Sequence, residues 1–435
     1  MDPWGLTTSV LLACVLLLIF LSQWSQGLKK GKLPPGPTPL PFLGNLLQLD
    51  LKNMIASFSQ LAEKYGSIYT VYFGSQRIVV LYGYKIMKEA LIDQGDGFLD
   101  RGSNPIFDDV YKKTGVAFSD GETWKQMRRF SLMTLRNFGM GKRSIEERVQ
   151  EEAQYLVEEL RKTKGQPTDP NFILGWAPCN VICSILFHDR FKYNDEKFQY
   201  LMKLLNEFFQ LLNSRWVQEK DNPHSEFDLE NLLMTGINLF IAGTETTSST
   251  VRYGLLLILK HPDAQAKIHE EIDRVIGHNR APSIKDRLAM PYLDAVIHEV
   301  QRFANIAPLN LAHAVTRDIH LQQYFLPKGT TIFPLLFPIL FDSKEFPNPE
   351  RFDPQHFLDK NGKFKKSDYF MAFSIGKRSC LGEGLARMEL FLFFATILQK
   401  FTLKLVGDPN EISINTKLIG ITCRPPFYEV CFLPR

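Results

Sequence analysis

Residues 373–382 of the chain read Phe373-Ser374-Ile375-Gly376-Lys377-Arg378-Ser379-Cys380-Leu381-Gly382. A glycine-containing loop leads into Cys380, and a stretch with helical spacing, 381–400, follows at once. A cysteine just before a helix lies beside unpaired backbone N–H groups and a partial positive charge, both of which stabilise a thiolate. Gly376 and Gly382 would let the backbone approach a flat cofactor closely. Although an isolated cysteine is most often a small buried residue, these flanks favour a thiolate metal ligand at Cys380.

The composition of the chain is that of an ordinary globular protein. It has 435 residues, of which 45% are hydrophobic and 23% charged. The formal net charge of +4 argues against a nucleic-acid-binding protein, which would carry a concentrated basic face. Six cysteines without a CxxC pair indicate neither a disulfide scaffold nor a structural zinc site, and free thiols in a reducing compartment fit better.

The N-terminus carries a membrane signal. Val10 to Leu21 is an unbroken apolar run, a little short for a free-standing span. A cleavable signal peptide is the alternative, but Asp2 precedes the run and lysines follow it without a small-residue cleavage site. Positive charge on that flank keeps the following chain cytoplasmic. We therefore expect a retained anchor over 1–27, a basic and proline-rich linker over 28–45 and a globular domain over 46–435.

Apolar spacing predicts mostly helices in this domain. Residues 67–81 instead favour strand–turn–strand around Gly74-Ser75, and further strands are expected at Tyr324–Pro334 and the C-terminus. The fold class is therefore mainly α with small β-sheets. Helices are expected at Met54–Lys64, Lys85–Ile92, Gly121–Thr134, Ser144–Lys162, Lys197–Leu212, Leu229–Lys260, Asp263–Ile276, Tyr292–Ala304 and Leu381–Lys400.

One expected helix, Leu229–Lys260, is long, free of proline and apolar on all faces. Such a helix lies either in the middle of a large protein or in a membrane. Its centre holds Gly243 and the polar residues Thr244 to Thr247, which are unsuited to lipid. We therefore expect a buried central helix.

Several motifs together resemble the microsomal cytochromes P450 of vertebrate family 2, most closely subfamily C. They are residues 373–382, Ala242-Gly243-Thr244-Glu245-Thr246-Thr247, Glu299-Val300-Gln301-Arg302 and the proline run of 33–41. The resemblance spans nearly the whole chain. It implies the cytochrome P450 fold, with haem b (iron protoporphyrin IX) as cofactor and Cys380 as its axial thiolate ligand, an arrangement that favours O–O cleavage.

The resemblance also assigns roles to other residues. Thr246 matches the threonine that helps to deliver protons to bound oxygen, and Glu245 matches its acidic neighbour. Glu299 and Arg302, spaced to share a helix face, match a structural network that Arg351 joins. The haem propionates are expected to contact Arg101, Trp124, Arg128, His313 and Arg378. The substrate is expected to face Ile106, Phe107, Val116, Phe118, Asn238, Ile241, Ala242, Leu309, Leu311 and Ile421, which ordinary core packing would also explain.

The implied partners are those of a microsomal monooxygenase. NADPH–cytochrome P450 reductase would supply electrons from NADPH, with cytochrome b5 as a second candidate, at the endoplasmic reticulum membrane. The reductase would dock on basic side chains near the ligand loop, which otherwise form a solvated face; these are Lys125, Arg129, Arg136 and Lys377. Lipophilic substrates such as fatty acids (arachidonate among them), drugs or steroids are expected.

The chain departs from the family after Gln218, where the two flanks of a family segment are joined directly. The missing stretch is about 60 residues, enough for several helices of the distal lid. Without it the substrate cavity would lose its roof and admit water. Ala312 and Phe341 also replace the proline and histidine common at these positions. Two alternatives to a monooxygenase follow: a catalytically impaired, splice-type haem protein, and a haem-thiolate isomerase, which the Glu245-Thr246 pair disfavours.

Overall fold

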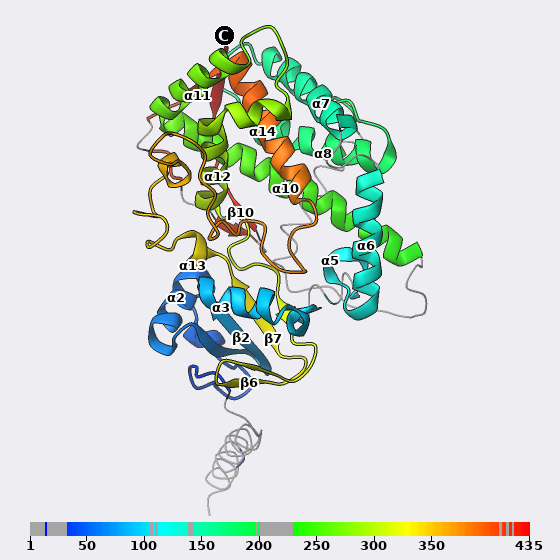
Figure 1. Ribbon diagram of the computed structural model, residues 1–435, viewed down its shortest axis with the longest axis vertical. Helices are drawn as coiled ribbons and strands as arrows, with labels where there is room; N and C mark the ends of the chain where they lie inside the picture. The colour runs from blue at the N-terminus through cyan, green and yellow to red at the C-terminus, as the bar shows by residue number, and fades with distance from the viewer. Residues whose placement is uncertain are drawn as a thin grey trace, which may run out of the picture. The chain divides into compact units, whose positions relative to one another are not determined.

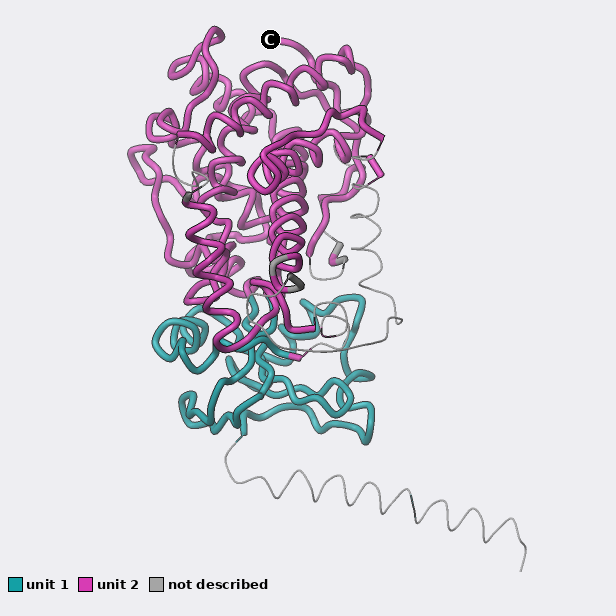
Figure 2. Tube along the Cα trace, turned by 90° about the vertical axis from the view of Figure 1, so that its right-hand side faces the viewer, with its two compact units in different colours: residues 1–102, 311–335 teal, residues 103–310, 336–435 magenta. Residues whose placement is uncertain are grey.

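The computed structural model describes residues 14, 33–103, 108, 112–137, 143–196, 199–200, 229–408, 411–414, 417–419 and 422–435. The chain forms two compact units, Met1–Gly102 with Leu311–Leu335 (unit 1) and Ser103–Asn310 with Leu336–Arg435 (unit 2) (Figure 2). Within the described part, no helix has the length and apolarity needed to cross a membrane. The expected anchor over 1–27 (Cys14 apart), the junction after Gln218 and nearly all of the expected helix Lys197–Leu212 lie outside the described residues.

Unit 1 is built on a five-stranded sheet of order β1-β2-β7-β4-β3. β1 and β2 are antiparallel, and Phe73 faces Gln76 across a turn in which Gly74 has a φ of 60°. A positive φ suits glycine, and the hairpin confirms the strand–turn–strand prediction for residues 67–81. β7 runs parallel to β2 and antiparallel to β4. The strands are β1 (Ile68–Phe73), β2 (Gln76–Tyr82), β7 (Thr331–Leu335), β4 (His313–Ala314) and β3 (Asp100–Arg101).

Short helices and one hairpin complete unit 1. The side chain of Asn53 caps the first long helix by accepting a hydrogen bond from Ala56 N at 3.2 Å. The helix expected at Lys85–Ile92 is an α-helix that continues as a π-helical turn. The elements are η1 (Leu46–Gln48), α2 (Met54–Tyr65), α3 (Tyr84–Lys88), η2 (Glu89–Asp93), η3 (Gly95–Phe98) and the antiparallel pair β5 (Ile319–Leu321) and β6 (Tyr324–Leu326).

Unit 2 is mainly helical, and with the small sheets this confirms the expected fold class. Its helices are α5 (Gly115–Phe118), α6 (Gly121–Asn137), α7 (Arg143–Lys162), α8 (Asn171–Phe187), α10 (Leu229–Lys260), α11 (Pro262–Val275), η4 (Ile284–Ala289), α12 (Pro291–Ala304), α13 (Phe337–Leu340), η5 (Pro354–Phe357) and α14 (Glu383–Lys400). Two antiparallel pairs accompany them, β8 (Phe401–Leu405) with β11 (Val430–Pro434), and β9 (Lys417–Ile419) with β10 (Thr422–Arg424).

The core of unit 2 lies around α10, α14, α8 and α12. α10 has the predicted bounds, and its residues 253–258, apart from Gly254, are hydrophobic and almost fully buried. α14, in orange, runs across α10 (Figure 1). A Cβ at Gly254 would overlap the ring of Phe394, so glycine lets the two helices approach closely. The prediction of a buried central helix is confirmed for this second half of α10, whereas Leu233 and Ala242 in the first half are exposed.

Candidate functional site

The loop before α14 is held in shape by its own backbone. Cys380 N donates to Phe373 O at 2.9 Å, and Ser379 N donates to Gly376 O at 3.1 Å. Gly376 has a φ of 79°, a conformation that side chains rarely allow. Gly382 is the N-cap residue of α14. Cys380 therefore lies two residues before Gly382, the N-cap residue of this long helix. The sequence predicts a cysteine just before a helix at this place.

The thiol of Cys380 is recessed but uncovered. The side chain is solvent-accessible, yet enough protein surrounds the sulfur that burial raises its pKa. The backbone N–H groups of Gly382 and Glu383 and the charge of Arg128 act in the opposite direction and lower the pKa. These donors favour the thiolate, which is the form that binds a metal.

Three side chains expected to contact propionates lie together near this loop. Arg128 Nη2 donates to Ser379 O at 2.9 Å. The guanidinium of Arg378 lies 4.1 Å from the centre of the Trp124 ring, and its Nη2 donates to Ser119 O at 2.5 Å. Trp124 is buried, and its Nε1 has no hydrogen-bond partner among the described residues. A buried donor without a partner is costly, so it fits a cofactor that brings an acceptor.

The other two expected propionate contacts, Arg101 and His313, form a pair within unit 1. They face each other across β3 and β4, and both are buried. His313 Nδ1 lies 2.7 Å from Phe98 O, so Nδ1 carries the hydrogen. Arg101 Nη1 lies 3.5 Å from Ala312 O.

The polar residues at the centre of α10 point to different partners. Thr246 Oγ1 donates to Ala242 O at 2.7 Å. Glu245 Oε1 instead accepts from Arg424 Nε at 2.6 Å and from Ser249 Oγ at 3.2 Å. The carboxylate of Glu245 is therefore held in an ion pair with β10, and sequence reasoning did not foresee Arg424.

Gly243 has a packing role that the sequence did not reveal. A Cβ there would lie 2.5 Å from Ile182 Cδ1 of α8. A larger residue there would therefore force the Ile182 side chain of α8 to move. α10 is helical throughout this segment.

A buried acid joins the helix of Thr246 to the helix that follows Cys380. Glu389, on α14, is 1% exposed and accepts from Thr247 Oγ1 at 3.1 Å. Burial raises the pKa of Glu389 to about 8, partly offset by the bond from Thr247. This contact fixes α10 next to α14 one residue from Thr246.

The Glu299–Arg302 pair is fully buried and bidentate. Arg302 Nε and Nη2 donate to the two carboxylate oxygens of Glu299 at 2.7 and 2.8 Å, and both side chains are 0% exposed. Arg302 also donates to the backbone carbonyls of Leu340 and Arg351. It lies 5.2 Å from the ring of Phe341, one of the departures from the family.

The third side chain of this network is not that of Arg351. The Arg351 side chain is exposed, and the residue contacts the network through its carbonyl oxygen. His356 Nδ1 instead lies 3.1 Å from Glu299 Oε2. Burial acts to lower the pKa of His356, but Glu299 and the Pro347 carbonyl raise it above the ordinary value. Arg351 thus contacts this network through its backbone, and His356, which sequence reasoning missed, adds a third side chain.

Comparison with known proteins agrees with this geometry. The sequence profile of the cytochrome P450 family matches residues 34–219 and 211–432. The chain belongs to the cytochrome P450 family. It is 53% identical to cytochrome P450 2C23 of Rattus norvegicus and 53% identical to cytochrome P450 2C44 of Mus musculus, each over the full length of both chains. It is 51% identical to cytochrome P450 2C8 of Homo sapiens over 98% of this chain and 99% of that one. The protein is thus a monooxygenase of the 2C type, a family whose cofactor is a haem with a thiolate ligand.

The length of these alignments bears on the shortened chain. The alignment with the rat P450 covers 494 positions, whereas this P450 has 435 residues in all. At least 59 of those positions, 494 minus 435, therefore have no residue here. The family profile matches in two pieces that meet at residues 211–219, which include the predicted junction.

The residues expected to face the substrate of this P450 differ in their surroundings. Asn238 is buried, and its Oδ1 accepts from Ala117 N at 3.0 Å, while Asn231 Oδ1 accepts from Gly115 N at 3.1 Å. These bonds tie α5 to α10, so Asn238 has a structural role. Ile106, Phe107 and Ile421 lie outside the described residues. The others are buried (Val116), partly buried (Phe118, Ile241, Leu309, Leu311) or exposed (Ala242).

Proposed function

We propose that this P450 binds haem b with Cys380 as its axial ligand and inserts one atom of O2 into a lipophilic substrate. The observation that carries the proposal is the recessed, uncovered thiol of Cys380, in a loop whose Arg378 stacks on Trp124, together with a Trp124 Nε1 that has no hydrogen-bond partner among the described residues. Bound haem supplies the oxygen chemistry, because electron density from a thiolate ligand favours O–O cleavage. Electrons would come from NADPH through cytochrome P450 reductase.

The side chains around Cys380 would hold the propionates. Trp124 Nε1 is a ready donor, and the guanidiniums of Arg128 and Arg378 provide positive charge. Arg101 and His313 are also proposed to contact the propionates. The Nδ1–H of His313 already donates to Phe98 O, so Nε2 is the ring nitrogen left for a propionate.

Thr246 is the better candidate for proton delivery of the two assigned residues. Its hydroxyl hydrogen goes to Ala242 O, so the lone pairs of Oγ1 stay available to accept a hydrogen bond. Glu245 is held by Arg424, and a relay through its carboxylate requires that ion pair to open. A Thr246→Ala variant should therefore lose more product per NADPH than a Glu245→Gln variant, measured together with hydrogen peroxide release.

Fatty acids such as arachidonate, drugs and steroids are the proposed substrates, because the side chains assigned to the substrate are largely apolar. The reductase is proposed to dock on α6, where Lys125, Arg129 and Arg136 are exposed and share one helix face, with the exposed Lys377 of the ligand loop. Cytochrome b5 is a second candidate partner. The proposed location is the endoplasmic reticulum membrane, with residues 1–27 as anchor and the remaining chain on the cytoplasmic side.

A second candidate function is a haem-binding P450 without turnover. At least 59 positions of the rat relative lack a counterpart, 494 aligned positions against 435 residues, and the two-piece profile match supports one deletion near Gln218. The resemblance assigns that segment to the distal lid, whereas the residues around Cys380 are all present. Haem ligation should therefore be more robust than turnover.

One experiment separates the candidates. The full chain is expressed, reduced and treated with carbon monoxide, and its absorption spectrum is recorded beside NADPH-driven turnover with purified reductase. A thiolate-type Soret band with turnover supports the monooxygenase, and the band without turnover supports the impaired form. Cys380→Ala should lose the thiolate band, with Cys431→Ala as the matched control. A chain that takes up no haem contradicts both candidates.

A further inference from the structure

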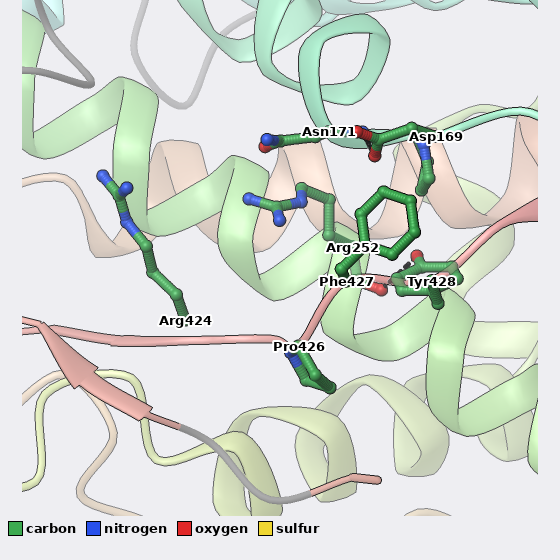
Figure 3. Close-up of a pocket in the computed structure, with 8 residues that line it drawn as sticks. Asp169, Asn171, Arg252, Arg424, Pro426, Phe427 and Tyr428 are labelled. Atoms are coloured by element: carbon green, nitrogen blue, oxygen red, sulfur yellow. Dashed lines mark hydrogen bonds between the residues drawn. The ribbon is translucent and has the colours of Figure 1, made fainter. Parts of the chain in front are cut away.

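An open pocket lies in unit 2 between the N-terminal end of α8, the second half of α10 and the segment that follows β10. Its volume is about 230 Å³. Figure 3 shows the Asn171 amide and the guanidiniums of Arg252 and Arg424 around one space, with Phe427 and Tyr428 on the other side of Arg252. None of the lining residues is assigned to haem, reductase or substrate, so the inference does not rest on the proposed function, although Arg424 also pairs with Glu245.

Arg252 is the cation in this pocket that has no salt-bridge partner among the described residues. Its side chain is partly buried, and its Nε has no hydrogen-bond partner among the described residues. Burial lowers the pKa of Arg252, although Tyr428, Glu245 and Asp169 act to raise it. A guanidinium stays charged at neutral pH regardless. A partly buried cation with unmet hydrogen bonds costs free energy that a bound anion would offset.

The acids near Arg252 are already engaged elsewhere. Glu245 forms its ion pair with Arg424 at 2.6 Å. Asp169 Oδ1 accepts the backbone N–H of Asn171 at 2.9 Å at the start of α8, and its side chain is exposed. Tyr428 donates its hydroxyl hydrogen to the backbone carbonyl of Arg252 at 2.6 Å. Asp169 also lines the pocket, but among the described residues no carboxylate is hydrogen-bonded to the Arg252 guanidinium.

We propose that this pocket binds a small oxyanion, the phosphate or carboxylate group of a soluble metabolite. The planar fork of Arg252 is suited to two oxygens of one anion. Asn171 adds a side-chain N–H donor from the adjacent element, and Arg424, whose charge is paired with Glu245, lines the same pocket. The apolar wall of Phe427, which is 73% exposed, leaves room for a short organic tail.

The test measures anion binding by the full chain purified in detergent. Inorganic phosphate and hexanoate are titrated separately by calorimetry, with chloride at the same ionic strength and pH as reference. We expect a dissociation constant in the range of about 1 mM for the better anion. The stronger of the two heats identifies phosphate or carboxylate as the preferred group. No heat from either anion up to about 50 mM, or an equal effect of chloride, overturns the proposal.

Variants of Arg252 locate the binding. Arg252→Met keeps the length of the side chain and should weaken binding by about ten-fold or more, since it removes a bidentate, charge-assisted contact. Arg252→Lys should weaken it less, because a lysine keeps the charge but not the fork. Arg143→Met, at an arginine with an 89% exposed side chain, is the matched control and should bind as the unchanged chain does. Unaltered binding by a folded Arg252→Met, with folding checked by circular dichroism, overturns the proposal. The carbon monoxide spectrum tests haem binding separately, so a failure of the anion site is distinguishable from a failure of the haem site.

Discussion

Unit 2 contains two groups of buried charge that differ in how completely they are paired. Around Glu299 and Arg302, both 0% exposed, a bidentate ion pair is joined by His356, the Asp353 N–H and two backbone carbonyls. Around Arg252, the nearby carboxylates bond to other groups, and Nε has no partner within the described residues. One cluster is complete and the other is not.

The difference predicts opposite effects for the same kind of substitution. Removing one member of a complete buried cluster leaves an uncompensated charge, which is strongly destabilising. Removing a cation that has no partner takes away a desolvation cost and leaves nothing unpaired. Burial alone therefore does not reveal whether an arginine stabilises this protein.

The largest effect is expected at Arg302. Arg302→Met leaves the Glu299 carboxylate buried without its bidentate donor, and should lower the free energy of unfolding by about 3–5 kcal/mol. Urea unfolding followed by circular dichroism measures the change. Arg143→Met breaks an exposed pair with Glu147 and should change stability by less than about 0.5 kcal/mol. A loss below about 1 kcal/mol for Arg302→Met would contradict the claim that removing this arginine leaves an uncompensated buried charge on Glu299.

Glu389 has one hydrogen-bond partner within the described part of the chain, Thr247, and so lies between the complete and the incomplete cluster. Its pKa in the folded chain is about 8 against an ordinary 4.5. The folded state therefore binds the proton more tightly, so the stability that Glu389 contributes is full below pH 4.5 and is lost as the pH rises to 8. Between pH 4.5 and 7 the loss is about 3 kcal/mol.

Glu389→Gln should remove this pH dependence, because the amide stays neutral and still accepts from Thr247. Unfolding is measured at several pH values for the variant and for Glu122→Gln, whose acid is 59% exposed and serves as control. If the slope for Glu389→Gln matches that of the control, Glu389 is ionised in the folded chain and the assignment fails.

A smaller effect is expected at His356, the outer member of the complete cluster. Its folded-state pKa is raised, chiefly by Glu299 acting against burial. The stability from the His356–Glu299 contact is therefore full below about pH 6.5 and is lost as the pH rises through the raised pKa. His356→Gln should flatten stability above pH 6.5, whereas Arg351→Gln, at an exposed side chain, should leave the decline in place. Equal profiles for the two variants would contradict the assignment of this pH dependence to His356.

Sequence reasoning succeeded where a pattern was local. The bounds of α10 match the prediction because its long, proline-free sequence favours one continuous helix. The hairpin of β1 and β2 was predicted from Gly74 at its turn. α8 was missed altogether. It contains Pro178, and it is buried on most of its surface between α7 and α10, so no amphipathic pattern marks it.

Contacts between distant residues were harder to foresee. Cys380, Trp124 and Arg378 were predicted through motifs, whereas the pairing of Glu245 with Arg424 joins residues 179 apart in sequence. Asn238 was assigned to the substrate, but its oxygen holds the backbone of α5. A polar side chain on a helix gives no signal of which loop it will bind.

The smallest expected effect has the opposite sign and returns to Arg252. In chloride buffer free of phosphate and organic acids, Arg252→Met should leave the free energy of unfolding unchanged or raise it by up to about 1 kcal/mol, because an unpartnered cation is replaced by an apolar side chain of similar length. Urea unfolding of this variant beside Arg302→Met compares the two clusters under one condition. A loss of more than about 1 kcal/mol would mean that the guanidinium already has a counter-ion in the folded chain. Two variants with opposite signs would instead show that pairing, and not burial, decides what these arginines contribute.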